Sequence, residues 1–137
     1  MPTIPDDYRD LFERETFAHF ATTLPDGTSH VSPVWVDYDG EYVLVAVQRN
    51  SRKHKNIQGE PTVAFSITDP DNPYRFVSVR GAVAEQTDDD AEVGPYLDAQ
   101  SRQYWGTDYP HELDHVLLKI RPKNVVTQEF EIPDPDD

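Results

Sequence analysis

A cluster of cations stands out in a chain that is otherwise acidic. The formal net charge of the 137 residues is -14, yet positions 49–55 hold four of the twelve basic residues, namely Arg49, Arg52, Lys53 and Lys55. An apolar run precedes the cluster, and Ser51 introduces a polar stretch that closes at Gly59, as in a strand leading into a helix. The start of such a helix offers backbone N–H groups and a favourable dipole to an anion. We interpret the segment as a phosphate clamp for a nucleotide-like cofactor. On charge alone, a solvated basic turn that offsets the surrounding acid is an equal alternative.

A second pattern has the form of a metal site. Residues 111–115 read His-Glu-Leu-Asp-His, which matches the HExxH signature of zinc proteases. That chemistry needs both histidines on one face of a helix and a third ligand farther along the chain. Here Pro110 precedes the pattern and His115 opens an apolar run typical of a strand. We therefore predict no metal site, and a zinc hydrolase becomes a remote alternative.

Composition limits the remaining classes of function. The length fits one domain spanning residues 1–137, and the absence of cysteine excludes disulfides and thiolate chemistry. The N-terminal residues lack the pattern of a signal peptide, and no apolar run is long enough to cross a bilayer, so we expect a cytoplasmic protein without membrane contact. The 26 acidic against 12 basic residues argue against a nucleic-acid partner. The same balance resembles proteins of salt-loving (halophilic) organisms, although an ordinary acidic mesophilic protein remains an alternative.

Periodicity predicts mostly strands, with three short helices between them. The helices are expected at 5–15, 51–58 and from 87 or 88 to about 104, with Gly59 as a C-terminal cap and Gly94-Pro95 as a kink or restart. The strands are expected at 17–24, 29–38, 41–47, 62–68, 74–86, 115–120 and 125–132, the first three forming a meander. Gly81 within a strand indicates a bulge or corner. Six or seven closely spaced strands favour a mainly β fold, a small antiparallel barrel, flanked by an N-terminal helical segment (1–16) and an acidic tail (133–137).

Four segments, in this order, carry a resemblance to a known family. They are 21–28 leading into 31–35, the basic segment 51–57, 69–75 leading into 79–81, and 120–122. Together they resemble the pyridoxamine 5'-phosphate oxidase-like family, whose fold is an FMN-binding split β-barrel, and most closely its branch that uses the deazaflavin F420. One departure concerns the strand before the clamp, which ends Ala46-Val47 where relatives often have Asn-Thr. Backbone N–H groups or Gln48 would then replace a missing hydroxyl at the phosphate.

The resemblance implies a set of cofactor contacts. The ring system would lie against Ser32, Pro33 and Val34, and the phosphate would be held at the end of the strand and the start of the helix. The implied phosphate residues are Val47, Gln48, Ser51, Arg52 and Lys53, with Lys55 near a longer acidic tail. Because family members place the cofactor at a homodimer interface, Tyr74, Arg75 and Trp105 are candidates for contacts from a second subunit. Aromatic residues of a small barrel more often serve core or dimer packing, and that alternative stays open.

The function that the resemblance implies is hydride transfer between F420 or FMN and a small organic substrate. The cofactor would carry this chemistry and the protein would orient it, so the sequence identifies binding residues but no catalytic acid or base. The alternative from another class is a protein that binds or carries a flavin or deazaflavin without turnover.

Overall fold

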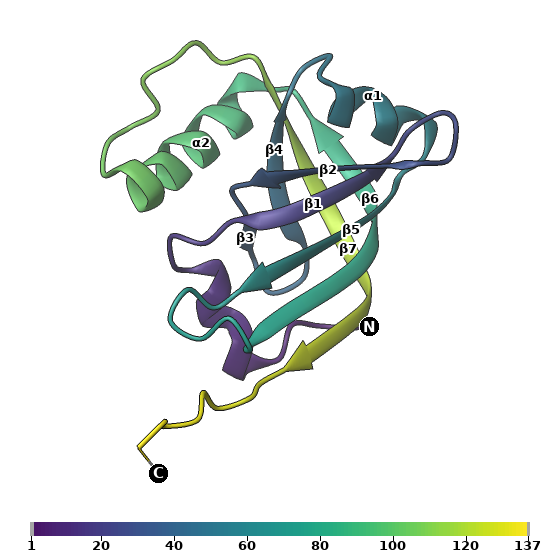
Figure 1. Cartoon of the computed structure of the whole chain (residues 1–137). Helices are drawn as coiled ribbons and strands as arrows, with labels where there is room; N and C mark the ends of the chain where they lie inside the picture. The colour runs from purple at the N-terminus through teal and green to yellow at the C-terminus, as the bar shows by residue number, and fades with distance from the viewer. Residues whose placement is uncertain (1, 137) are drawn as a thin grey trace.

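The computed structural model describes residues 2–136, so the first and last residues of the predicted end segments lie outside the described residues. Seven antiparallel strands form one curled sheet in the order β2-β1-β5-β6-β7-β4-β3. The strands are β1 Ala18–Thr23, β2 Ser29–Val34, β3 Asp37–Tyr38, β4 Val43–Gln48, β5 Thr62–Thr68, β6 Phe76–Thr87 and β7 His115–Gln128. Three helical elements complete the fold, namely the 3₁₀ helix η1 Asp6–Phe12, α1 Arg52–Gly59 and α2 Asp90–Trp105. This is the predicted mainly β split barrel (Figure 1).

Alternating side chains build the barrel core. Along β1, β4 and β5, every second residue is buried, because successive side chains of a strand point to opposite faces of the sheet. Phe20, Val45 and Ile67 are among the fully buried core residues, and η1 closes the core with Leu11 and Phe12.

The helix α2 covers part of the outer face of the barrel. In β7, Val116, Leu117 and Leu118 are all buried, which breaks the alternation. The reason is that Leu117 points outward and packs against Val93 and Leu97 of α2. Figure 1 shows α2 on one side of β4 and α1 on the other, so both helices flank the strand that ends at the basic cluster.

The predicted meander is wrong at its second and third strands. The chain leaves β2 at Val34, passes through Trp35 and the buried Val36, and resumes as β3, which pairs only with β4. Among the described residues, β2 pairs only with β1, whereas β4 pairs with both β3 and β7. The predicted strand 29–38 is therefore two strands at opposite ends of the sheet, and the connection between them crosses the split of the barrel.

The predicted strands 115–120 and 125–132 are joined in a single strand, β7. Strand β7 continues through Pro122, which lies opposite Gly81 where the register between β6 and β7 shifts. A proline has no backbone N–H to donate to the neighbouring strand. At a bulge this hydrogen bond is not needed, so the strand continues through Pro122. The bulge predicted at Gly81 is confirmed, while residues 129–132 lie beyond the strand.

The three observed helices differ from the predicted ones at their ends. The first is a 3₁₀ helix that ends at Phe12. The second includes Gly59, and its C-cap is Glu60. The third begins at Asp90 behind the N-cap Asp89, continues through Pro95, and is capped by Gly106 in the left-handed conformation with φ 81°.

Ion pairs join η1 to the loop between β5 and β6. Hydrogen bonds and charge from Arg75 lower the pKa of Asp10. Burial raises the pKa of Asp69, but hydrogen bonds from the Asp71 N–H, Arg75 and Arg14 outweigh it, so the net shift is downward.

Acid is expected to weaken the fold through these two carboxylates. Their folded pKa values lie below the unfolded values, so they stabilise the protein above about pH 4 and lose this contribution as the pH falls through the folded pKa values. Urea unfolding between pH 7 and pH 3 measures the effect. An Asp69→Asn variant should show a shallower pH dependence, and an equal slope in both proteins would contradict the assignment.

Candidate functional site

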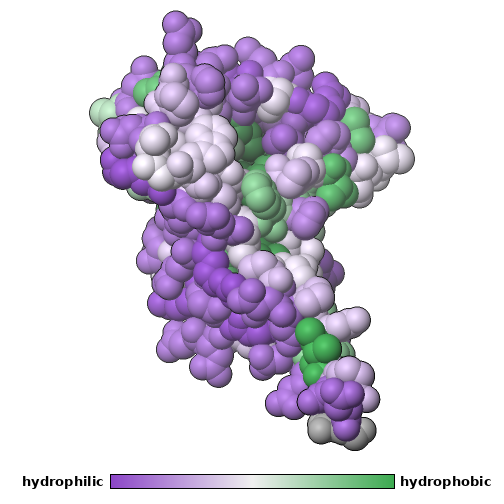
Figure 2. All heavy atoms as spheres, turned by 60° about the vertical axis from the view of Figure 1, so that its left-hand side comes forward, coloured by the Kyte–Doolittle hydropathy of each residue, from purple (hydrophilic) through white to green (hydrophobic). Residues whose placement is uncertain are grey.

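A pocket of about 310 Å³ lies between the edges of β2 and β4 and beneath α2. Figure 2, which brings the α2 side of the molecule forward, shows apolar atoms deep in a hollow that hydrophilic surface surrounds. The lining residues come from both edges of the split sheet, from α1 and α2, and from the segment that follows α2. They are Phe17, Pro33, Val34, Trp35, Ala46, Val47, Gln48, Ser51, Lys53, Tyr96, Leu97, Gln100, Trp105, Tyr109 and His115.

One end of the pocket is cationic. Ser51 is the N-cap of α1, and its hydroxyl accepts a hydrogen bond from the backbone N–H of His54 at 3.3 Å. The preceding Asn50 has φ 63° in the left-handed region, which turns the chain sharply from β4 into the helix. The Lys53 ammonium donates to Ser32 Oγ on β2 at 3.1 Å and has no carboxylate partner within residues 2–136. A half-buried cation beside an exposed helix start can hold an anionic group.

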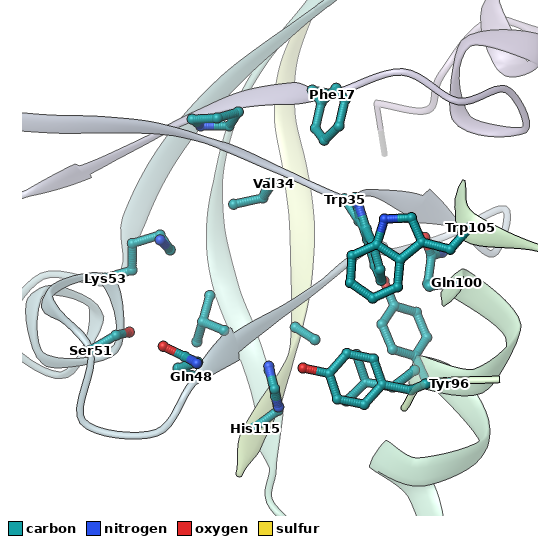
Figure 3. A pocket seen from close by; sticks show the side chains of 15 residues that line it. Phe17, Val34, Trp35, Gln48, Ser51, Lys53, Tyr96, Gln100, Trp105 and His115 are labelled. Carbon is teal, nitrogen blue, oxygen red and sulfur yellow. The ribbon is translucent and has the colours of Figure 1, made fainter. Parts of the chain in front are cut away.

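The other end of the pocket is aromatic. Trp35 stacks on Tyr104 with a centroid distance of 4.9 Å and an interplanar angle of 12°. Trp105 meets the edge of Trp35 at 4.6 Å, and Tyr109 stacks on Trp105 at 6.3 Å. Figure 3 shows Trp35, Trp105 and Tyr96 facing Ser51 and Lys53 across the pocket, with Val34 on one wall and Gln48 and His115 on the opposite wall. The pocket can therefore hold a molecule with a planar body and an anionic tail.

Polar groups behind the aromatic end hold α2 against the sheet. The Tyr96 hydroxyl donates to the backbone carbonyl of Leu44 at 3.0 Å, and burial raises the pKa of this phenol well above its ordinary value. Burial also raises the pKa of Asp37 on β3, partly offset by hydrogen bonds from the Tyr38 N–H and from Gln100. These bonds fix the orientation of Tyr96 and Gln100, two of the α2 side chains that line the pocket.

The structure brings together most of the predicted site residues. Pro33, Val34, Val47, Gln48, Ser51, Lys53 and Trp105 line the pocket, and Ser32 contacts Lys53 at its edge. Trp105, which is also a candidate for a contact from a second subunit, lines the pocket of its own chain. Arg52 and Lys55 are exposed on α1 and do not line this pocket.

Tyr74 and Arg75 lie elsewhere in this chain. Tyr74 is exposed in the loop before β6, and it does not line the pocket. Arg75 is bound by carboxylates, with its guanidinium 2.7 Å from Asp10 and 3.0 Å from Asp69. Its surroundings are those of a structural ion pair.

Sequence reasoning missed the residues that α2 and the segment around it bring to the pocket. These are Tyr96, Leu97 and Gln100 of α2 and Tyr109 beyond it; the other missed lining residues, from elsewhere in the fold, are Phe17, Trp35, Ala46 and His115. The available signal was compositional, because four of the chain's aromatic residues lie between positions 96 and 109. Nothing in the local pattern indicated that this segment folds back over the split of the barrel.

The HExxH-like segment lies on a loop and at the first residue of β7. His111 precedes the strand and His115 begins it, as the sequence predicted, so the two rings are not on one helix face. Among residues 2–136, no group of three or more histidine or acidic side chains is arranged to hold a metal ion. The helices in the same range are all too short or too polar to cross a membrane.

Comparison with known proteins identifies the relatives of this chain. A solved structure of an F420 reductase is 33% identical in sequence, with a TM-score of 0.79, and the match covers 90% of this chain and 98% of that one. The conserved hypothetical protein Rv2991 from Mycobacterium tuberculosis is 18% identical over 98% of this chain and 95% of its own, with a TM-score of 0.77. General Stress Protein 26 from Bacillus anthracis is 17% identical over 87% and 88%, with a TM-score of 0.67. No curated protein matches the sequence. The profile of the pyridoxamine 5'-phosphate oxidase family matches residues 4–129, and the chain belongs to this family.

Proposed function

We propose that this protein is a cytoplasmic, homodimeric oxidoreductase that binds F420 or FMN and transfers hydride to or from a small organic substrate. The observation that carries the proposal is the polarity of the pocket. At one end lie a helix start and Lys53, which has no carboxylate partner among residues 2–136, and a wall of aromatic rings lies at the other end. A flavin-like cofactor has the same two-part character, a planar ring system and an anionic tail.

The residues present fit such a cofactor. Ser51, Lys53 and Gln48 would hold the phosphate, because a hydroxyl, an ammonium and an amide all donate hydrogen bonds to its oxygens. Pro33 and Val34 offer an apolar strand edge to the ring system. When bound, the cofactor supplies hydride transfer, while the protein binds it, orients it and excludes water. Arg52 and Lys55 are proposed contacts for a longer acidic tail, such as that of F420.

A second subunit is proposed to cover the open side of the pocket. Phe17 and Trp105 line the pocket and remain half exposed, at 50% and 55%. Large aromatic side chains at the rim of a pocket are typical of a surface that another chain covers. Tyr74, which is 55% exposed, stays a proposed contact of that partner. Light scattering on the purified protein tests the dimer, and a monomer at all concentrations would contradict it.

The first experiment is a titration of the purified protein with F420 and FMN separately, followed by fluorescence. The similarity to an F420 reductase makes F420 the first cofactor to test. Binding of either cofactor supports the proposal, and binding of neither overturns it. Binding without turnover on a panel of substrates would instead indicate a carrier of the cofactor.

Replacing Lys53 with alanine is expected to raise the Kd of the cofactor about 10- to 100-fold. The change removes one charge-assisted hydrogen bond to the phosphate, which contributes about 1.5–3 kcal/mol. The same titration measures the effect. Lys123→Ala is the matched control, because Lys123 is exposed on β7 and does not line the pocket. Equal affinities for the wild type and Lys53→Ala would show that the phosphate binds elsewhere.

A further inference from the structure

The inference concerns His115 and rests on the proposed function. His115 is the first residue of β7 and pairs in register with Gln48, the last residue of β4. Both side chains line the pocket, on the wall between the cationic and aromatic ends (Figure 3). The imidazole packs edge-on against Tyr109, with a centroid distance of 5.5 Å and an interplanar angle of 87°. The ring is thus held in place by the strand pairing and by one aromatic neighbour.

Within residues 2–136, no carboxylate forms an ion pair with the imidazole. Its Nδ1 is buried without a hydrogen-bond partner, which leaves Nε2 as the nitrogen available to a ligand. The neighbouring Asp114 is exposed and pairs with Arg49 at 3.4 Å. Burial lowers the pKa of His115, and the charge of Asp114 offsets this only in part. Burial therefore favours the neutral imidazole, which can accept a proton at Nε2 and return it, as a general base and acid do.

The other ionisable groups around the pocket are less suited to exchange a proton. Lys53 lies at the opposite end and is assigned to the phosphate. Tyr96 donates to a backbone carbonyl, and phenols ordinarily titrate near pH 10. Tyr109 contacts the His115 ring and also contacts His111, and Tyr96 lines the same pocket. The charged groups beside it in the chain are Asp114 and its partner Arg49, which also pairs with Asp88.

We propose that His115 is the catalytic residue that exchanges a proton with the substrate during hydride transfer. In the reducing direction, a reduced deazaflavin or flavin delivers hydride to an electrophilic carbon of a conjugated C=C or C=O group. The protonated imidazole then gives its Nε2 proton to the neighbouring atom that receives the electron pair. The substrate gains two hydrogens, the cofactor is oxidised, and the neutral imidazole recovers a proton from water. In the oxidising direction, the neutral ring accepts the proton.

The test combines kinetics with a direct measurement on the ring. The small quinone menadione serves as the hydride acceptor, reduced F420 as the donor, and NMR of the ring nitrogens follows the protonation of His115. We expect kcat/KM to fall as the pH rises through the pKa that NMR gives for His115, because only the protonated ring donates. His115→Gln should lower kcat/KM about 100-fold and remove this inflection. The cofactor Kd should stay within about threefold of the wild-type value.

His111→Gln is the matched control, since the His111 ring also packs edge-on against Tyr109, with a centroid distance of 5.5 Å, but does not line the pocket. It should retain the wild-type rate and pH profile. Wild-type rate and pH profile in His115→Gln would overturn the proposal. The proposal would also be overturned if the NMR signals of the His115 ring nitrogens did not change when menadione is added to the cofactor-loaded protein. This holds whether or not the protein turns menadione over. Failure of F420 and FMN to bind is a different result, because it removes the proposed function itself.

Discussion

Replacing Arg75 with alanine is expected to lower the free energy of unfolding by about 3 kcal/mol, the low end of the range for breaking a buried ion pair. The guanidinium is 12% exposed and contacts Asp10, Asp69 and Glu129, and it also lies over the ring of Tyr8 at 4.9 Å. Asp69 is 10% exposed, so its carboxylate would keep only Arg14 as a cationic partner. The half-exposed Asp10 and Glu129 would recover water, which limits the loss.

Urea unfolding at pH 7 measures this change. Arg102→Ala is the control, because Arg102 pairs with Asp108 on the surface, where both side chains are more than half exposed. Such a surface pair contributes at most about 1 kcal/mol. Similar losses in the two variants would show that the Arg75 cluster is no stronger than a surface pair. High salt should reduce the loss in Arg75→Ala only slightly, since buried pairs are screened less than exposed ones.

Replacing Gly81 with alanine is expected to destabilise the barrel by about 3 kcal/mol, the upper end of the effect of overpacking. A Cβ at this position would lie 2.3 Å from the backbone oxygen of Arg121 and 3.3 Å from Ile120 Cγ2. Because the first of these atoms belongs to the backbone of β7, the bulge between β6 and β7 must shift to accept the methyl group.

Thermal and urea unfolding measure the Gly81 effect, with Gly59→Ala as the control. A Cβ at Gly59 meets no atom within 4 Å, so alanine there should be neutral or stabilise the protein by up to about 1 kcal/mol. Equal stabilities of Gly81→Ala and the wild type would mean that the bulge adapts without strain.

The sequence predicted the strands well and their pairing less well. Alternating burial is a local property, so β1, β4 and β5 were found close to their observed limits. Pairing depends on residues far apart in the chain. A local pattern could not separate β2 from β3, because Trp35 and Val36 continue the apolar character across the point where the strand ends. Pro122 led to the opposite error, because one strand was predicted as two. Only the pairing with β6 shows that this proline lies at a bulge, where the strand can continue.

The candidate site was also predictable where one short segment forms it, and not where it joins distant segments. The basic end was predictable, because Ser51 and Lys53 follow a strand directly and form a helix start within one short segment. The aromatic end was not, because it combines Trp35 from the β2–β3 connection with Trp105, the last residue of α2, and Tyr109 from the loop that follows. For His115, the sequence pattern pointed to a metal site shared with His111, which lies on a loop. The position of the ring at the pocket follows from the strand register that pairs His115 with Gln48.

The two-residue passage through Trp35 and Val36 has a mechanical consequence. No ladder of hydrogen bonds joins β2 to β4 within the described residues, so the two lips of the pocket can separate without breaking the sheet. Their separation is limited by this covalent tether at one end and by the Lys53–Ser32 contact at the other. The tether is anchored, since Val36 is fully buried and Trp35 stacks on Tyr104. We therefore expect any separation of the lips to hinge at the aromatic end and to require the Lys53–Ser32 contact at the cationic end to open.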